Sequence, residues 1–247
     1  MRLLEGKIAV VTGSAKGIGA QTALTLAQHG ASGIAVADVM EEAGRETCRR
    51  IEAETGARCL FVRTDVSNRE DVDGLFDAAL RRWGTVDILY NCAGIVTTNT
   101  LVQSDEAAWD RVMDINLKGT FLCSRAAYAI MKEKRSGRII NTASISGRIG
   151  GIASGVEYIA SKGGVIALTK GLAKKAAQYG ITVNAVSPGF VLTDMAKNFS
   201  HFDPASVPLG YIAGPAEIAD VVVFLASDLS RYMTGCTLDV TGGVYMS

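Results

Sequence analysis

The chain has 247 residues, in which 25 Lys and Arg residues balance 25 Asp and Glu residues. This neutral charge and a hydrophobic share of 48% argue against a disordered chain and against a polyanion-binding surface, so we expect no nucleic-acid partner. Glycine is unusually common: it makes up 27 of the 247 residues, about 11%, against about 7% in an average protein. This surplus indicates repeated use of tight turns or closely packed backbone.

The sequence also shows neither the pattern of a signal peptide nor an apolar segment long enough to span a membrane. Glu5 and Lys7 precede any apolar run, unlike a signal peptide, and the longest strongly apolar stretch, residues 221–226, is too short to cross a bilayer. We therefore expect a cytoplasmic protein that does not bind membranes. The five cysteines are widely spaced without a C-x-x-C pair and there are only two histidines, so we expect neither a disulfide framework nor a metal site.

Short β-branched runs alternate with longer helical patterns along the whole chain. The predicted strands are 7–12, 33–37, 57–63, 86–91, 137–142, 181–186 and 236–240. The predicted helices are 18–29, 41–55, 68–83, 105–134, 157–179 and 215–227. Helices of this length between strands imply right-handed crossovers and a parallel sheet covered on both faces. We predict one α/β domain over residues 1–247, a doubly wound Rossmann fold of about seven strands.

Periodicity is weakest in residues 195–214, which follow the sixth predicted strand. In doubly wound sheets, ligands bind beyond the carboxyl ends of the strands, where this segment would begin. Two interpretations remain open: a substrate lid, or an ordinary surface loop whose aromatic side chains pack inward.

A glycine cluster, Gly13, Gly17 and Gly19, joins the first strand to the first helix. A pyrophosphate must approach backbone N–H groups at a helix N-terminus, and β-carbons would block that approach. Glycines alone are weak evidence, but this cluster lies in a βαβ unit, and an acidic residue, Asp38, follows 19 residues after Gly19, close to the roughly 20 expected for a carboxylate that binds the ribose of a dinucleotide. The predicted cofactor turn is Gly13, Ser14, Lys16, Gly17, Ile18 and Gly19.

Asp38 also bears on the choice of cofactor. A carboxylate can accept hydrogen bonds from ribose hydroxyls but repels a 2′-phosphate, so we predict NAD(H) and regard NADP(H) as the weaker alternative. Lys16 favours the opposite choice, because an ammonium group can pair with a phosphate, but it is flexible and solvated. A purely structural role for Asp38, as a turn residue or the N-cap of the next helix, also stays open.

At this point the motifs resemble those of the short-chain dehydrogenase/reductase family, over essentially the whole chain. They are the glycine turn, Asp65-Val66, Asn91-Cys-Ala-Gly94, Asn116, Ser144, Tyr158-x-x-x-Lys162 and Pro188-Gly189. The resemblance implies that Asp65 and Val66 bound the adenine pocket. It assigns further cofactor contacts to Asn91, Ala93, Gly94, Tyr158, Lys162, Pro188, Gly189, Val191 and Thr193. Within the family, the runs 183–190 and 234–243 resemble 3-oxoacyl-(acyl-carrier-protein) reductases and their polyol and secondary-alcohol dehydrogenase relatives.

Two departures from the family pattern stand out. Cys92 replaces the second asparagine of its motif, which removes a polar side chain without touching the chemistry. Ser144 and Tyr158 are 14 positions apart, one more than is usual, so the intervening loop is expected to be reshaped. Ser146 is a weaker candidate for the role of Ser144.

The predicted catalytic residues are Asn116, Ser144, Tyr158 and Lys162. Tyr158 and Lys162 stand at i and i+4 of a predicted helix and so share a face, although such a pair by itself is more often a solvated surface. A nearby ammonium lowers the pKa of a tyrosine, which suits proton transfer between Tyr158 and a substrate oxygen during hydride transfer. Ser144 would hydrogen-bond that oxygen. By resemblance Asn116 would hold a relay water; otherwise its side chain bonds helix backbone.

The substrate is predicted to be a small neutral or apolar secondary alcohol or polyol and its ketone. An NADPH-dependent 3-oxoacyl-(acyl-carrier-protein) reductase and a catalytically silent NAD-binding regulator are the alternatives. The basic residues Lys132, Lys134, Arg135 and Arg138 fit either a carrier-protein dock or a helix C-terminus decorated with cations. The helices 105–134 and 157–179 have surplus apolar positions and, as in family members, are expected to pack between subunits of a homotetramer.

Overall fold

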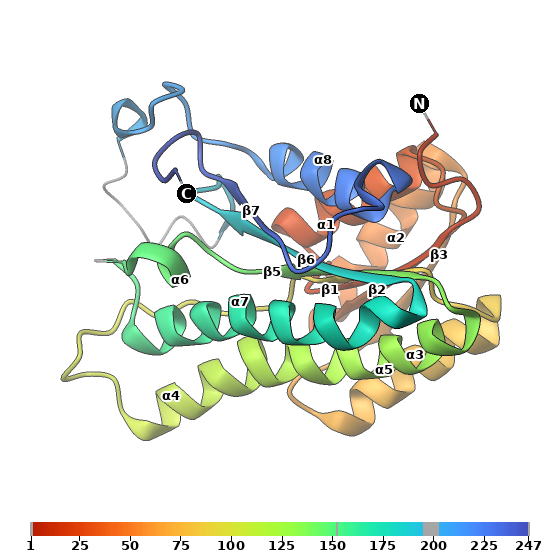
Figure 1. Cartoon of the computed structure of the whole chain (residues 1–247), viewed down its shortest axis with the longest axis horizontal. Helices are drawn as coiled ribbons and strands as arrows, with labels where there is room; N and C mark the ends of the chain where they lie inside the picture. The colour runs from red at the N-terminus through yellow and green to blue at the C-terminus, as the bar shows by residue number, and fades with distance from the viewer. Residues whose placement is uncertain (1, 152, 195–202, 247) are drawn as a thin grey trace.

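The computed structural model describes residues 2–151, 153–194 and 203–246, which form a single α/β domain around a parallel seven-stranded sheet (Figure 1). The strands are β1 (Ile8–Thr12), β2 (Gly33–Asp38), β3 (Arg58–Arg63), β4 (Ile88–Asn91), β5 (Gly137–Thr142), β6 (Ile181–Pro188) and β7 (Thr237–Val240). Their order in the sheet is β3-β2-β1-β4-β5-β6-β7. The predicted parallel, doubly wound architecture is therefore confirmed.

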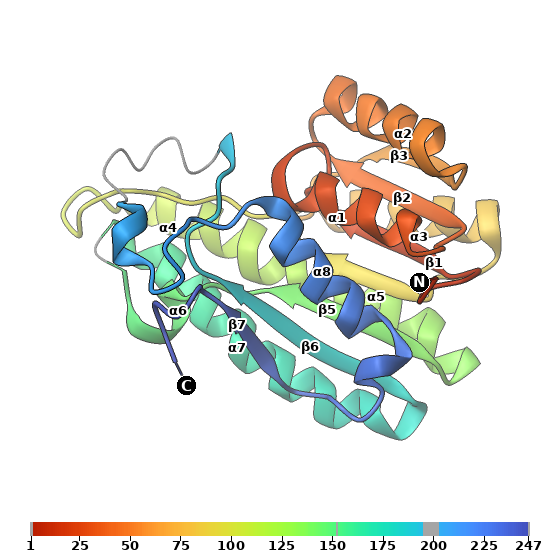
Figure 2. The same cartoon turned by 90° about the horizontal axis from the view of Figure 1, so that it is seen from above.

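Helices cover both faces of the sheet, as the turned view shows (Figure 2). The helices on one face are α1 (Gly17–Gln28), α2 (Glu41–Thr55) and α8 (Pro215–Ala226), and those on the other are α3 (Arg69–Trp83), α5 (Gly119–Lys134) and α7 (Val156–Ala176). Neighbouring residues of β1 serve the two cores in turn, since Val11 packs toward the first face and Val10 toward the second. This explains why the central strands are continuous apolar runs.

The strand order reverses between β1 and β4, because the chain adds β2 and β3 on one side of β1 and β4 to β7 on the other. At such a point the loops leaving the two strands diverge and open a crevice beyond their carboxyl ends. The glycine turn after β1 and the Asn91-Cys-Ala-Gly94 motif after β4 both lie at this crevice.

The predicted helix 105–134 is interrupted. It consists of α4 (Glu106–Met113), a π-helical turn at Asp114–Lys118 and α5. A π turn inserts extra backbone without altering side-chain hydrophobicity, so the amphipathic pattern did not reveal it. The last turn of the predicted helix 157–179 is 3-10 in form, at Ala177–Tyr179, and a short helix that was not predicted, α6 (Ser146–Ile149), follows Ser144. Most other boundaries shift by one or two residues.

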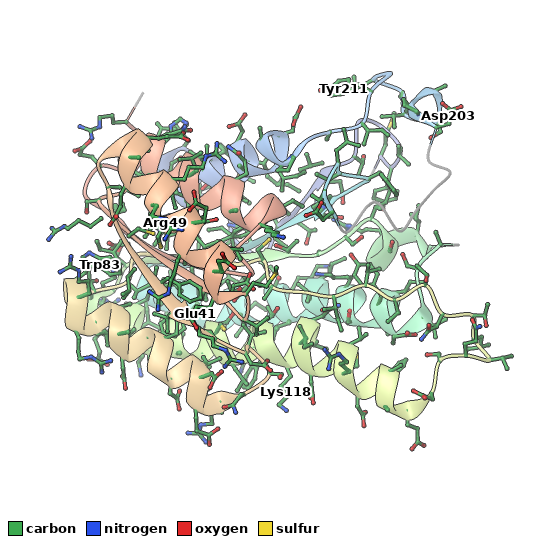
Figure 3. All side chains as sticks on the ribbon, turned by 180° about the vertical axis from the view of Figure 1, so that it is seen from behind. Glu41, Arg49, Trp83, Lys118, Asp203 and Tyr211 are labelled. Carbon is green, nitrogen blue, oxygen red and sulfur yellow. The ribbon has the colours of Figure 1, made fainter. Side chains whose placement is uncertain are left out.

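The described part of the predicted lid lies far from the amino edge of the sheet, where Trp83 packs against Gly33 at the start of β2 (Figure 3). Asp203 and Tyr211, in the described part of the predicted lid, lie at the opposite end of the molecule from Trp83, the last residue of α3 (Figure 3). Residues 195–202, the first part of that lid, lie outside the described residues. Among the helices of the described ranges, none is both long and apolar enough to cross a membrane.

Candidate active site

The turn between β1 and α1 leaves no room for a side chain at Gly13 or Gly19. Gly13 and Gly17 have φ angles of +62° and +58°, a region that favours glycine. A β-carbon on Gly13 would lie 2.5 Å from the Cα of Ala93, and one on Gly19 would lie 2.8 Å from the carbonyl carbon of Gly13. The backbone N–H groups at the start of α1 have no side-chain cap. The turn thus fits a pyrophosphate, which would bind these N–H groups.

The other residues of the turn have different surroundings. The Ser14 hydroxyl is buried, donates to the Val11 carbonyl at 2.6 Å and accepts from the Ala37 N–H at 3.1 Å. Ser14 therefore holds the turn against β2, and its backbone N–H also donates to the Ala37 carbonyl at 3.3 Å. Ile18 packs against the core beneath α1, whereas Lys16 is exposed.

Asp38 ends β2 beside this turn. Its Oδ2 accepts the Ala15 N–H at 3.0 Å and its Oδ1 accepts the Met40 N–H at 3.0 Å. Asp38 is not the N-cap of α2, since that position belongs to Met40. The carboxylate is half-buried and fixed at the edge of the crevice, where an adenosine ribose would lie if a pyrophosphate occupied the glycine turn.

The next two predicted residues follow β3. Hydrogen bonds from Ser67 hold the pKa of the Asp65 carboxyl below its usual range. Val66 is buried against Gly119, where an added β-carbon would lie 2.7 Å from its side chain. Asp65 thus shapes the turn after β3 with its carboxylate, and Val66 joins that turn to the start of α5.

The motif after β4 contributes mainly backbone to the crevice. The buried Asn91 amide donates to Ser124 at 3.0 Å and to Asn141 at 2.9 Å, so its side chain points into the protein. Ala93 supports Gly13, as described above. Gly94 lies close to two predicted catalytic groups, because a β-carbon there would lie 3.2 Å from Asn116 Oδ1 and 3.6 Å from Lys162 Nζ.

Asn116 lies in the π-helical turn and is fully buried. Its Oδ1 accepts the Ile95 N–H at 2.8 Å, and its Nδ2 donates to the Ile95 carbonyl at 2.9 Å and to Ser161 Oγ at 3.1 Å. The bonds to backbone reach a separate loop rather than the helix of Asn116 itself. Asn116 thereby ties the loop after β4 to α7, close to Lys162.

Three predicted catalytic side chains converge where β5 ends and α7 begins. Lys162 is 4% exposed, donates to the Thr142 carbonyl at 2.7 Å and places Nζ 5.7 Å from the centre of the Tyr158 ring. Burial lowers the pKa of Lys162 to about 8. Burial also raises the pKa of Tyr158, and contact with Ser144 partly opposes that rise.

The structure distinguishes the two candidate serines. Ser144 lies beside the Tyr158 hydroxyl and accepts the Ser146 N–H at 3.1 Å. Ser146 begins α6, and its Oγ would lie 3.0 Å from a β-carbon on Gly151, so it faces its own loop. The longer spacing is thus accommodated by α6 and the glycines that follow it, without displacing Ser144 from Tyr158.

The segment after β6 closes the crevice from the other side. Gly189 passes close to Thr241, Val191 forms a parallel bridge to Ala213, and Thr193 lies 3.6 Å from where a β-carbon on Gly17 would be. Pro188 is the last residue of β6. Residues 203–214 of the predicted lid are described: Val207 is buried, whereas Leu209 and Tyr211 are 65% and 51% exposed. Tyr211, an aromatic residue in the described part of this segment, therefore does not pack inward.

Sequence reasoning missed three contributors: Ile95, Ser161 and Glu157. Ser161 lies three residues after Tyr158, on the same face of α7, and donates to the Tyr158 carbonyl at 2.8 Å. That helical spacing could have identified it. Glu157 is fully buried, which no local pattern indicates, because its partners lie more than 50 positions away.

Comparisons with known proteins agree with this geometry. A sequence model of the family described as "Enoyl-(Acyl carrier protein) reductase" matches residues 13–245. The chain is 41% identical to 3-oxoacyl-(acyl-carrier-protein) reductase FabG of Vibrio cholerae, over 98% of this chain and 99% of the relative. It is 38% identical to 3-oxoacyl-(acyl-carrier-protein) reductase of Synechocystis over 100% of both chains. The crystal structure of a short-chain type dehydrogenase/reductase from Mycobacterium marinum superimposes with a TM-score of 0.94, at 34% identity, covering 99% of this chain and 97% of that one.

Proposed function

The chain belongs to the short-chain dehydrogenase/reductase family and is an oxidoreductase, and from that premise we propose that it interconverts a ketone and a secondary alcohol at Ser144, Tyr158 and Lys162. The observation that carries the proposal is the convergence of these three side chains near a glycine turn that has no space for β-carbons at Gly13 and Gly19. When bound, a nicotinamide cofactor supplies or accepts the hydride.

The residues divide the remaining chemistry between them. Tyr158 holds a proton on its hydroxyl, which burial keeps protonated in the free enzyme, and gives it to the substrate oxygen during reduction. Ser144 donates a hydrogen bond to the same oxygen as negative charge develops on it. The Lys162 ammonium lies beside Tyr158 and stabilises the phenolate that remains. Alcohol oxidation uses the same groups in reverse.

Asp38 supports NAD(H) as the cofactor. A 2′-phosphate bound at the end of β2 would be repelled by this carboxylate, whereas ribose hydroxyls can donate to it. Lys16 is exposed and offers a mobile countercharge, which a solvated side chain provides only weakly. The proposed cofactor is therefore NAD(H), with NADP(H) the weaker candidate.

The first candidate substrate is a 3-oxoacyl thioester and its 3-hydroxyacyl product. The names of the relatives from Vibrio cholerae and Synechocystis support this choice over a small alcohol or polyol. The second candidate is a small secondary alcohol, which is favoured by the surroundings of the basic cluster described next. Intact Ser144, Tyr158 and Lys162 argue against a catalytically silent regulator.

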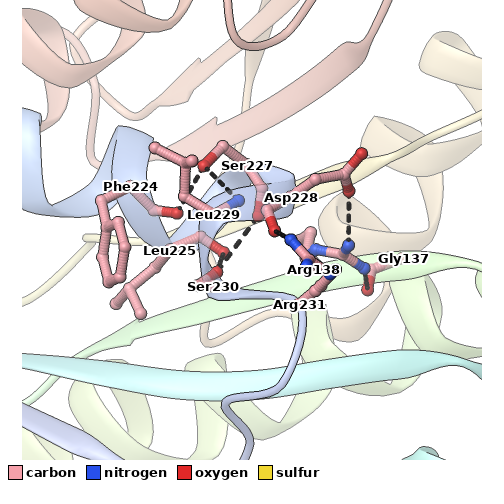
Figure 4. A network of polar contacts seen from close by, with 9 residues as sticks. All are labelled: Gly137, Arg138, Phe224, Leu225, Ser227, Asp228, Leu229, Ser230 and Arg231. Carbon is pink, nitrogen blue, oxygen red and sulfur yellow. Dashed lines mark hydrogen bonds and ion pairs between the residues drawn. The ribbon is translucent and has the colours of Figure 1, made fainter.

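The basic cluster lies at the wrong edge of the sheet to deliver substrate from a carrier protein. Arg138 is the second residue of β5 and pairs with Asp228 at 3.0 Å (Figure 4), while Lys134 pairs with Asp87. Lys132 and Arg135 lie over the Tyr179 ring. Ser144 follows the opposite end of β5, a strand length of about 20 Å away. These cations serve local structure, so carrier docking at this cluster is not part of the proposal.

Kinetics with purified protein test the proposal. We expect the protein to reduce acetoacetyl-coenzyme A with NADH in preference to NADPH. The reaction is monitored by the loss of fluorescence from the reduced cofactor. Tyr158→Phe should lower kcat by about 10²- to 10⁴-fold, as expected for loss of a general acid. Turnover of small secondary alcohols but not of the thioester would favour the second candidate. Near-normal turnover by Tyr158→Phe would refute the mechanism.

We also propose that the chain forms a homotetramer through the face of α4, α5 and α7. A hollow on this face is lined by Met113, Leu117, Phe121, Gly164 and Leu168, and Phe121 and Trp109 are 42% and 40% exposed. A second copy would remove this apolar surface from water. Sedimentation equilibrium should give four times the chain mass, and a monomer would contradict the proposal.

A further inference from the structure

A buried carboxylate precedes the predicted catalytic tyrosine. Glu157 lies in the first turn of α7 and is fully buried. It accepts hydrogen bonds from Ser104 Oγ at 2.7 Å, from Asn99 Nδ2 at 3.5 Å and from Thr97 Oγ1. All three donors belong to the segment between β4 and α4, so one side chain gathers that segment onto the helix that carries Tyr158.

The backbone reinforces this connection. The Gly155 N–H donates to the Thr97 carbonyl at 2.7 Å, and a β-carbon on Gly155 would lie 2.8 Å from Glu157 Oε1. The two segments therefore approach as closely as backbone allows. Any larger residue at position 155 would separate them.

Glu157 remains ionised despite its burial. Burial raises the pKa of its carboxyl, but hydrogen bonds from Thr97, Ser104 and Asn99 outweigh that effect and hold the pKa below its usual value. Its position in the first turn of α7 adds the favourable helix dipole. The ion pairs found among the described residues do not include Glu157, so neutral donors and the helix end carry the stabilisation.

The two sides of this contact differ in rigidity. Helix α7 spans 21 residues and packs against the sheet through buried residues such as Val165 and Thr169. Residues 95–105 form neither helix nor strand, and Leu101 and Val102 are 75% and 96% exposed. If the contact is broken, the loop should move and the helix should stay.

That loop starts at the candidate site. It leaves β4 through Gly94 and Ile95, which lie against Asn116 and near Lys162, and it runs along the carboxyl edge of the sheet beside the start of α7 (Figure 2). A substrate held at Tyr158 would therefore have this loop as a wall. The distance between this loop and Tyr158 therefore depends on the hydrogen bonds by which Glu157 holds the loop against α7.

We propose that Glu157 is a positioning residue, which fixes the β4–α4 loop against the N-terminus of α7 and so determines where this loop would contact a substrate held at Tyr158. The inference rests on the proposed function. It predicts that loss of the carboxylate affects substrate binding more than the chemical step or cofactor binding, because the loop is the part that is released.

The test compares Glu157→Gln with Glu106→Gln, which removes an exposed carboxylate from the first turn of α4. For Glu157→Gln we expect KM for the ketone to rise about tenfold, the effect of losing roughly one charge-assisted hydrogen bond, with kcat and the NADH dissociation constant unchanged. Amide hydrogen exchange in residues 96–104 should accelerate. Glu106→Gln should leave all of these values as in the wild type.

Removing a donor tests the same contact from the other side. Thr97→Val should raise KM in the same way, and the double variant with Glu157→Gln should be little worse than either single variant, because both break one contact. If Glu157→Gln fails to fold, Ser104→Ala removes a single donor and should still accelerate exchange in the loop.

Several outcomes would overturn the inference. A lower thermal midpoint with unchanged exchange and unchanged KM would make Glu157 a purely structural residue. A fall in kcat at constant KM would place its effect on the chemical step instead. If the wild type turns over no ketone or alcohol, the proposed function fails by itself, and faster loop exchange in Glu157→Gln still decides whether the contact holds the loop.

Discussion

Replacing Asp38 by asparagine should change the cofactor preference of the enzyme. The substitution keeps the size of the side chain and removes its charge at the end of β2. Asp38 now accepts two backbone N–H groups, from Ala15 and Met40, through different oxygens. An asparagine can accept only one of them, so about 1 kcal/mol of stability should also be lost.

The magnitude follows from charge and exposure. Hydrogen bonds to a charged acceptor contribute roughly 1 kcal/mol more than neutral ones, so NADH should bind about fivefold to tenfold more weakly. Two unit charges at 4 Å interact by about 1 kcal/mol in water and about 4 kcal/mol near a protein surface. For the half-buried Asp38 we take about 2 kcal/mol, so NADPH should gain about 30-fold.

The assay is kcat/KM for the two reduced cofactors at a fixed ketone concentration. The ratio of NADH to NADPH efficiency should fall by about two orders of magnitude in Asp38→Asn, the sum of both effects. Glu42→Gln, an exposed carboxylate in the first turn of α2, is the matched control and should leave the ratio unchanged. A wild type that prefers NADPH, or a ratio unaltered by Asp38→Asn, would refute the reasoning.

Two further predictions concern the tyrosine–lysine pair and the glycine turn. The pKa of Lys162 is lowered to about 8, so its ammonium form predominates below that pH and is lost above it; the single-turnover rate of ketone reduction should fall as pH rises through about 8, and a flat profile would contradict the role of Lys162. Gly19→Ala would bring a β-carbon within 2.9 Å of Ser14 Cα and should destabilise the fold by about 1–3 kcal/mol, measured as a lower thermal midpoint and weaker NADH binding. The control is Gly74→Ala in α3, where an added β-carbon would meet no atom within 4 Å, so this variant should be more stable than the wild type by about 0.5–1 kcal/mol. A similar loss of stability in both variants would show that local crowding is not the cause.

Much of this fold is legible in the sequence because hydrophobic periodicity is local. The apolar run of β1 spans 5 residues and the amphipathic pattern of α2 spans 15, and the structure has both elements at the predicted places. The break in the helix 105–134 was not predicted. The π turn is stabilised by hydrogen bonds from the Asn116 side chain to Ile95 and Ser161. Because these partners lie on other elements, the local sequence does not reveal the turn.

The candidate site shows the same division. Spacing within one helix placed Tyr158 and Lys162 on a common face, and the glycines of the turn after β1 followed from the needs of backbone packing. Spacing along the chain does not predict the direction in which a side chain points. Ser14 and Asn91 belong to the predicted cofactor motifs, yet their side chains point into the protein and meet Ala37, Ser124 and Asn141.

The sequence by itself determined the order of strands and helices, the glycine turn and the set of chemically capable residues, because these depend on periodicity and spacing along the chain. Only the tertiary structure decided which residues meet. It brought Ser144 rather than Ser146 to Tyr158, and it buried Glu157 against a loop more than 50 positions earlier. The physical reason is that burial and hydrogen bonding at a site depend on contacts between distant segments, which form only when the sheet assembles.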